Sequence, residues 1–177
     1  MSKRITTEEY FTMPETNRPM ELVYGYVREP PTPFGDHQSA VFRVAVLLDA
    51  HVRRYGLGRV FISPFDVVLD PEAALIVQPD VLFIARGRLN IVCSHVWGAP
   101  DLVVEVASPS TQIHDRTLKL AWYRRYGVKE CWLLYPHDRR IEIVDLESDA
   151  RESFTGEASV RSRVLPEFGE RAGDCFE

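Results

Sequence analysis

One apolar stripe at helical spacing runs through residues 36–55, and it limits the folds open to this chain. The residues that form the stripe recur every three or four positions: Val41, Val44, Ala45, Leu48, Val52 and Tyr55. Asp36 is the expected N-cap, and Gly56 and Gly58 are expected to end the helix. Strand-like apolar runs follow at residues 59–69, 77–85 and 101–107. A long helix with one buried face needs a sheet to pack on, so the pattern predicts an α/β domain.

The rest of the chain extends this pattern. Thr6 and Glu9 have capping-box spacing, which predicts a short helix near Thr7, and residues 20–29 predict a strand pair or bent strand around Gly25. A second helix is expected over residues 114–126, followed by strands at 130–135 and 140–145. The polar tail after Ser148 has no clear pattern. A length of 177 residues fits one domain, residues 1–177, with one sizeable core.

Composition excludes several classes of protein. The net charge of -5 argues against a protein that coats nucleic acid by bulk charge, although a local basic patch is compatible with a nuclease. No apolar run approaches the ~20 residues of a membrane helix, and the polar N-terminus does not resemble a signal peptide. We therefore expect a cytoplasmic protein without a membrane partner. The three cysteines are widely spaced, which indicates reduced thiols rather than a zinc site.

Two carboxylates stand in segments that are otherwise patterned for burial. Asp80 ends the triplet Gln78-Pro79-Asp80, and Glu105 lies in the run Asp101-Leu-Val-Val-Glu-Val. In that run Val103 and Glu105 should share one face of the strand. A charge there is costly unless it is paired or binds a cation, and two such acids offer the hard oxygen ligands that Mg²⁺ or Mn²⁺ prefers. Either acid alone is equally consistent with a structural ion pair to an arginine.

The helix that follows Glu105 carries further polar residues. Asp115, Lys119 and Tyr123 are spaced i, i+4, i+8 and fall on one face. Lys119 could reach the strand carboxylates and stabilise a phosphate, with Tyr123 as its hydrogen-bond partner. The alternative is an Asp115–Lys119 surface pair worth only ~0.3–0.5 kcal/mol. Basic residues on the same helix are either nucleic-acid backbone contacts or a solvated face: Arg116, Arg124 and Arg125.

Several stretches carry a family resemblance that covers nearly the whole chain. They are MELVYGYV (20–27), PPTPFGDHQ (30–38), VFISPFDVVLD (60–70), VQPDVLFI (77–84), GAPDLVVEVASPST (98–111), DRTLKLAWYRRYGVKECWLLYP (115–136) and SRVLP (162–166). In this order they resemble the Uma family of restriction endonuclease-like proteins, within the PD-(D/E)XK nuclease superfamily. The resemblance implies a restriction-endonuclease-like core with a central mixed β-sheet flanked by helices.

The resemblance also implies roles for individual residues. Asp80 and Glu105 become the metal-binding pair, and Glu21 becomes an upstream acid. The superfamily usually places its lysine two residues after the second acid, where this chain has Ala107. That departure moves the lysine role to Lys119.

Further roles follow if this interpretation holds. The Val106 carbonyl becomes a third metal ligand for Mg²⁺ or Mn²⁺. Gln78 is expected to orient a ligand or the nucleophile, and His37 to lie near the site. DNA is the expected partner, and a homodimer is expected from the resemblance alone.

Three functions remain open at this point. The first is a metal-dependent endodeoxyribonuclease that uses two carboxylates and a lysine. The second is a non-catalytic nuclease-fold binding or assembly module, suggested by the acidic net charge and by Ala107. The third is a hydrolase of small phosphate esters, which would act on a nucleotide but not on a polymer.

Overall fold

A six-stranded mixed sheet forms the centre of the protein. The computed structural model describes residues 4–14, 16, 18–32, 34–107 and 113–176, and the side chains of residues 113–115 lie outside this description. The strands of the large sheet are β3 (Gly58–Ile62), β6 (Val81–Ala85), β8 (Leu102–Val106), β9 (Glu130–Tyr135), β10 (Arg140–Asp145) and β11 (Arg151–Thr155). Their order is β11-β10-β9-β8-β6-β3, and only β8 and β9 pair in parallel.

A smaller sheet packs beside the first. Its strands are β1 (Glu21–Val23), β2 (Tyr26–Arg28), β4 (Val67–Asp70), β5 (Leu75–Val77) and β7 (Val96–Trp97), in the order β2-β1-β5-β4-β7. The predicted strand pair around Gly25 is therefore confirmed. Gly25 has φ +87, and a Cβ there would lie 3.1 Å from the Ile5 carbonyl oxygen, so the turn requires glycine.

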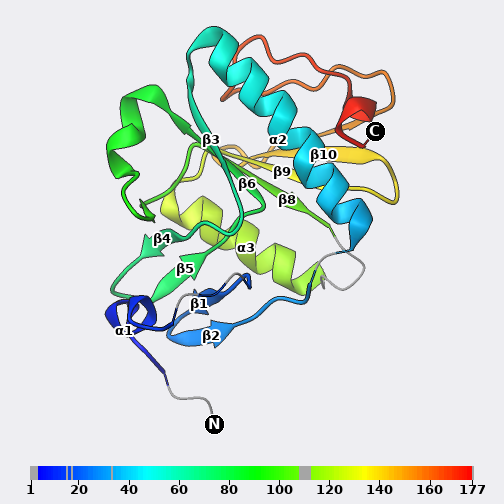
Figure 1. Ribbon diagram of the computed structural model, residues 1–177. Coiled ribbons are helices and arrows are strands. Elements are labelled where there is room, and N and C mark those ends of the chain that lie inside the picture. The colour runs from blue at the N-terminus through cyan, green and yellow to red at the C-terminus, as the bar shows by residue number, and fades with distance from the viewer. Residues whose placement is uncertain (1–3, 15, 17, 33, 108–112, 177) are drawn as a thin grey trace.

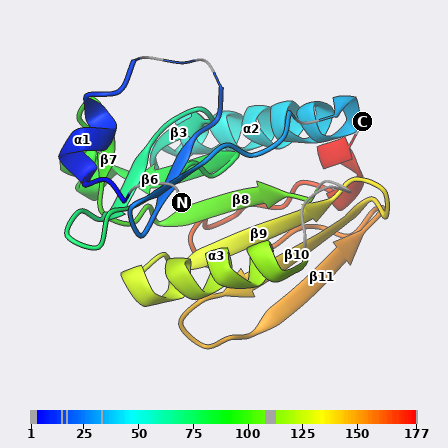
Figure 2. The ribbon, with the colours of Figure 1, turned by 90° about the horizontal axis from the view of Figure 1, so that it is seen from below.

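Helices cover both faces of the large sheet (Figure 1). Helix α2 (Gly35–Tyr55) packs on one face, while α3 (Ile113–Tyr126) and the smaller sheet pack on the other. Figure 2 looks from below and shows α3 crossing in front of β9 and β10. The short helix α1 (Thr7–Phe11) begins at the predicted Thr6 capping box. None of the helices within the described residues is long and apolar enough to cross a membrane.

The start of α2 differs from the prediction. Phe34, not Asp36, occupies the N-cap position, and no side chain caps the helix there. Asp36 lies instead in the first turn, where a carboxylate still favours the positive end of the helix dipole. The C-terminal end agrees with the prediction, because Gly56 adopts the left-handed conformation with φ 61.

Strand β8 has the alternation that the sequence predicted. Leu102, Val104 and Val106 belong to the core beneath α2. Val103 belongs to the core on the α3 side, so Glu105, two residues further, faces the same side. The face that carries the carboxylate is thus the face covered by α3.

Two predicted strands are each divided into two. The run at 59–69 becomes β3 and β4, and the run at 77–85 becomes β5 and β6. In each case the two halves belong to different sheets. Pro64 and Pro79 lie at the breaks, since proline cannot donate a ladder hydrogen bond. Asp80 therefore directly precedes β6 instead of lying inside a strand.

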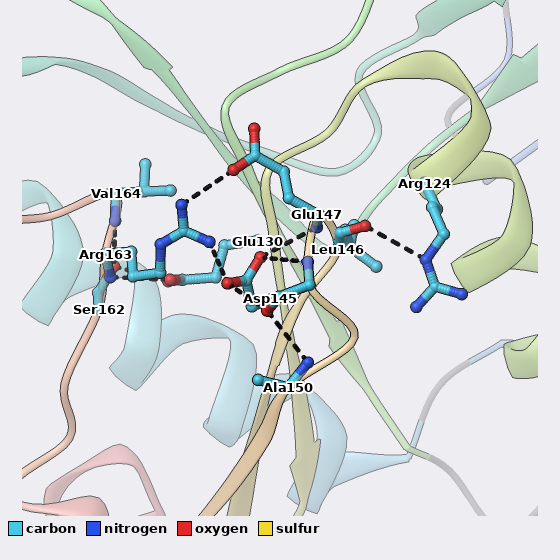
Figure 3. Close-up of polar contacts among 10 residues, drawn as sticks. Arg124, Glu130, Asp145, Leu146, Glu147, Ala150, Ser162, Arg163 and Val164 are labelled. Carbon is cyan, nitrogen blue, oxygen red and sulfur yellow. Dashed lines mark hydrogen bonds and ion pairs between the residues drawn. The ribbon is translucent and has the colours of Figure 1, made fainter.

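The C-terminal segment, which the sequence did not place, is tied to the large sheet by a buried carboxylate. Glu130, only 2% exposed, accepts hydrogen bonds from Trp132 Nε1 at 2.7 Å, Ser162 Oγ at 2.6 Å and the Arg163 N–H at 2.9 Å. Arg163 also pairs with Asp145 and Glu147 (Figure 3). The segment then ends in the 3₁₀ helix η2 (Ala172–Phe176) against α2.

A second buried acid fixes the opposite end of β8. Asp101 is fully buried and pairs with Arg88 of the 3₁₀ helix η1 (Arg86–Ile91) at 2.9 Å and with Lys129 at 2.8 Å. It also accepts the Ala85 N–H at 2.9 Å. Burial opposes its charge, but these partners outweigh burial and hold the pKa of Asp101 below its ordinary value. Asp101 is thus a structural ion-pair partner. This is the role that the sequence left open, beside metal binding, for Asp80 and Glu105.

Glu130→Ala should lower the free energy of unfolding by about 2–3 kcal/mol, because it leaves buried donors without their acceptor. Urea denaturation followed by circular dichroism measures this. The matched control is Glu147→Ala, since Glu147 is 61% exposed and also binds Arg163. It should change stability by less than about 0.5 kcal/mol. Equal effects of the two substitutions would show that Glu130 does not anchor the C-terminal segment.

Candidate active site

Three acids and one lysine converge where β1, β6, β8 and α3 meet. Lys119 Nζ lies 2.9 Å from Glu21 Oε1 and 3.3 Å from both carboxylate oxygens of Glu105. The Lys119 and Glu105 side chains are each 13% exposed, and that of Glu21 is 9% exposed. The lysine therefore bridges two acids that are far apart in the sequence. Its contacts are not those of a simple surface pair with Asp115. The Asp115 side chain itself lies outside the described residues.

Helical spacing explains how α3 presents its polar residues to β8. Lys119 and Tyr123 are one turn apart, and the Tyr123 hydroxyl donates a hydrogen bond to Glu105 Oε1. Tyr123 itself is fully buried. Glu105 is thus held by two donors from one face of the helix. The prediction that Lys119 and Tyr123 share a face is confirmed, although Tyr123 contacts the acid instead of the lysine.

Asp80 is fixed beside the end of β8. Its Oδ2 accepts the Val106 N–H at 2.7 Å and lies 3.3 Å from His37 Nε2. The Asp80 carbonyl also accepts the Ser63 N–H at 3.0 Å, which joins it to the end of β3. Because Val106 follows Glu105 directly, these contacts place the Asp80 carboxylate beside the end of β8, and both acids line the same cleft.

The site carries more negative than positive charge. Burial raises the pKa of Glu105 to about 7; Lys119 opposes the rise, while Asp80 and Glu21 add to it. Burial also opposes the charge of Lys119, but Glu105, Glu21 and Asp80 outweigh burial and hold its pKa above the ordinary value. Lys119 stays protonated, and it does not fully neutralise the acids around it.

This charge balance bears on whether the site suits a divalent cation. No three His, Cys, Asp or Glu side chains among the described residues form a ready-made metal cluster. Mg²⁺, however, is commonly held by one or two carboxylates and completes its shell with water and phosphate oxygens. The donors present are hard oxygens from Asp80 and Glu105, with the Val106 backbone lining the same cleft. His37 Nδ1 is buried without a hydrogen-bond partner within the described part of the chain. The donor set and the excess negative charge fit a single hard cation.

Gln78 has a scaffolding contact pattern. Its N–H donates to Glu21 Oε1 at 3.0 Å, and its side chain donates to Asp66 Oδ1 at 2.8 Å and accepts from the Met20 N–H at 3.1 Å. Asp66 also receives the Tyr10 hydroxyl at 3.3 Å. The Gln78 N–H thus fixes Glu21, and the Gln78 side chain is bound to Asp66 and Met20. Its role in orienting a ligand or the nucleophile stays a prediction. No sequence pattern indicated Asp66 or Tyr10, because neither has a fixed spacing in the chain to Gln78 or to the predicted metal-binding acids.

A cleft of about 1230 Å³ opens onto these groups. Arg116 lines the cleft, and its Nη1 is buried with no hydrogen-bond partner among the residues described. Arg124 donates to the Leu146 carbonyl (Figure 3) and pairs with Asp149, while Arg125 lies over the Tyr126 ring. Neither of these two lines the cleft. Of the three arginines predicted to contact a nucleic-acid backbone, Arg116 is the one placed beside the acids.

The fold and this site define a restriction-endonuclease-like protein. The Uma2 family model, described as "Putative restriction endonuclease", matches residues 7–172, and the chain belongs to that family. The fold is also that of a solved structure titled as a "putative nuclease belonging to DUF820" from Anabaena variabilis, with a TM-score of 0.82. The two chains are 20% identical, and the match covers 97% of each. No curated protein matches the sequence significantly.

The raised pKa of Glu105 predicts a pH dependence of stability. Its pKa rises from 4.5 to about 7 on folding, so the folded state binds the extra proton between these values. The unfolding free energy should therefore fall as pH rises through this window, by up to about 3 kcal/mol. Glu105→Gln should flatten the fall, as measured by urea denaturation from pH 4 to 8 in the presence of EDTA.

Glu142→Gln is the matched control for this measurement. Arg151 and Arg140 overcome the effect of burial and lower the pKa of Glu142, so its stabilisation is present above pH 4.5 and lost on acidification. The control should therefore keep the fall between pH 4.5 and 7. A wild-type profile that rises through that window would contradict the assignment.

Proposed function

We propose that the protein is a metal-dependent endodeoxyribonuclease. The observation that carries the proposal is the convergence of Glu21, Asp80 and Glu105 around Lys119 at the floor of one open cleft. Structural ion pairs usually neutralise each other, whereas this group has three acids around one lysine. Burial raises the pKa of Glu105 to about 7, and Asp80 and Glu21 add to the rise. Perturbed acids in a cleft are typical of catalytic sites. Membership of a family described as restriction endonucleases supports DNA as the substrate.

Asp80 and Glu105 would hold Mg²⁺ or Mn²⁺, with the Val106 carbonyl as a third donor. The bound ion supplies Lewis acidity and lowers the pKa of a water molecule. Tyr123 and Lys119 hold Glu105 in position by donating to its oxygens, and both donors oppose the rise in its pKa. The Val106 N–H donates to Asp80 and His37 lies beside it, so both hold the Asp80 carboxylate in position.

Lys119 brings the permanent positive charge of the site. Its three neighbouring acids hold the proton on Nζ, so the ammonium is available to stabilise negative charge that develops on the phosphate. Ala107 stands where the superfamily usually has its lysine. In this chain Lys119 reaches Glu105 from α3 instead of from β8. Arg116 supplies a further cationic group along the same cleft for backbone phosphates.

The test is cleavage of a plasmid and of labelled linear DNA by the purified protein. We expect cleavage with Mg²⁺ or Mn²⁺ and none in EDTA. Asp80→Ala and Glu105→Ala should abolish it, and Lys119→Met should slow it by about 10²–10³-fold. Circular dichroism checks that each variant is folded. The control is Asp138→Ala, an acid 57% exposed at the β9–β10 turn, which should leave the rate unchanged.

Other outcomes separate the competing functions. Cleavage that persists in both carboxylate variants would remove the assigned site. Binding of DNA without cleavage under all metal conditions would favour a non-catalytic module. Turnover of a dinucleotide without cleavage of polymer would favour a small phosphate-ester hydrolase.

A further inference from the structure

Part of the cleft is lined by residues that have no role in the proposed reaction. Beyond the acids it is lined by apolar side chains from α2, from β3 and from the segment after β3: Phe42, Val46, Val60, Phe61, Ile62 and Phe65. This apolar wall adjoins the candidate site, because Ile62 is paired with Val81 next to Asp80. A substrate that reaches the acids would therefore also contact the wall.

Several apolar side chains of this wall are exposed to solvent. Phe42 is 66% exposed, Ile62 55% and Val46 45%. Large apolar side chains grouped on one exposed surface commonly mark a binding site. Phe61 and Phe65, which also line the cleft, stack on each other at 5.1 Å with an interplanar angle of 28°.

Cationic side chains line the same cleft as the apolar groups. Arg53 and Arg18 line the cleft with the wall, and Arg116 lies near the acids. Arg53 pairs at 2.6 Å with Asp49, an exposed pair that phosphate can readily replace. Outside the cleft lining, the Arg59 guanidinium lies 4.9 Å from the Phe61 ring centre. Aromatic rings beside guanidinium groups are the combination that holds unpaired nucleotides, with bases on the rings and phosphates on the cations.

An intact duplex does not match this wall. Its bases are stacked inside, and it offers phosphates and sugars to the protein, so an exposed phenylalanine gains little from it. An unpaired strand exposes base faces to the rings.

From these observations we infer that the cleft binds single-stranded nucleic acid, with Phe42 and its apolar neighbours as a base-stacking surface. The inference rests on the proposed function for the polymer and adds the strandedness of the substrate. It assigns to Phe42 a binding role separate from the chemistry of Asp80, Glu105 and Lys119.

The test measures binding by fluorescence anisotropy in EDTA, so that metal-dependent cleavage cannot interfere. The probes are a fluorescein-labelled mixed-sequence 15-nucleotide DNA strand and the same strand annealed to its complement (the length being about one cleft-spanning site). We expect tighter binding of the single strand. Phe42→Ala should weaken single-strand binding by about fivefold to a hundredfold, the usual effect of losing one stacking aromatic, and should leave duplex binding unchanged.

Tyr55→Ala is the matched control. Tyr55 lies on the same helix, is 47% exposed and does not line the cleft, so its removal should not change strand affinity. Both positions are exposed, and thermal melts should show both variants folded.

Two results would overturn the inference. One is equal or tighter binding of the duplex, with no effect of Phe42→Ala. The other is a dimer in sedimentation experiments that Phe42→Ala converts to a monomer without loss of strand affinity, because the wall would then be an interface between two copies. Strand binding without cleavage would defeat only the proposed function. Duplex cleavage that is indifferent to Phe42→Ala would defeat only this inference.

Discussion

The ion pairs of Lys119 with Glu21 and Glu105 are the interaction on which the site depends. They join α3 to β8 of the large sheet and to β1 of the smaller one. Buried charges are costly unless they are paired, so each of these three groups needs the other elements in place. The same contacts that hold the two sheets together therefore gather the acids at the cleft, and site geometry is coupled to the assembly of the fold.

Different hydrogen-bond donors hold the three acids around Lys119. Tyr123 and Lys119 donate to Glu105, the Val106 N–H and His37 contact Asp80, and the Gln78 N–H donates to Glu21. Each acid thus has a donor that contacts it alone, while Lys119 is shared by Glu21 and Glu105. Asp101, at the other end of β8, differs from Glu105 in the direction of its pKa shift. Two basic side chains and the Ala85 N–H hold the pKa of Asp101 low against burial. The pKa of Glu105 is raised by burial, with Asp80 and Glu21 adding to the rise, although Lys119 opposes it.

Much of the fold was readable from pattern. The long helix, the alternation in β8, the second helix and strands β9 and β10 follow from apolar periodicity, which is a local property. The errors lie where local pattern could not decide. Two continuous apolar runs predict single strands, yet the chain turns at Pro64 and Pro79 and enters another sheet. The C-terminal segment lacks periodicity, and its place is set by hydrogen bonds to Glu130.

The sequence by itself determined which residues were available: two acids in strand-like segments, and a lysine and a tyrosine one helical turn apart. It also determined which face of β8 carries Glu105, because strand alternation is fixed by the backbone. Only the tertiary structure decided that Glu21 reaches Lys119, that Gln78 supports Glu21, and that Arg116 lines the cleft while Arg124 does not. Those contacts join residues far apart in the chain, and long-range packing leaves no spacing signal in the sequence.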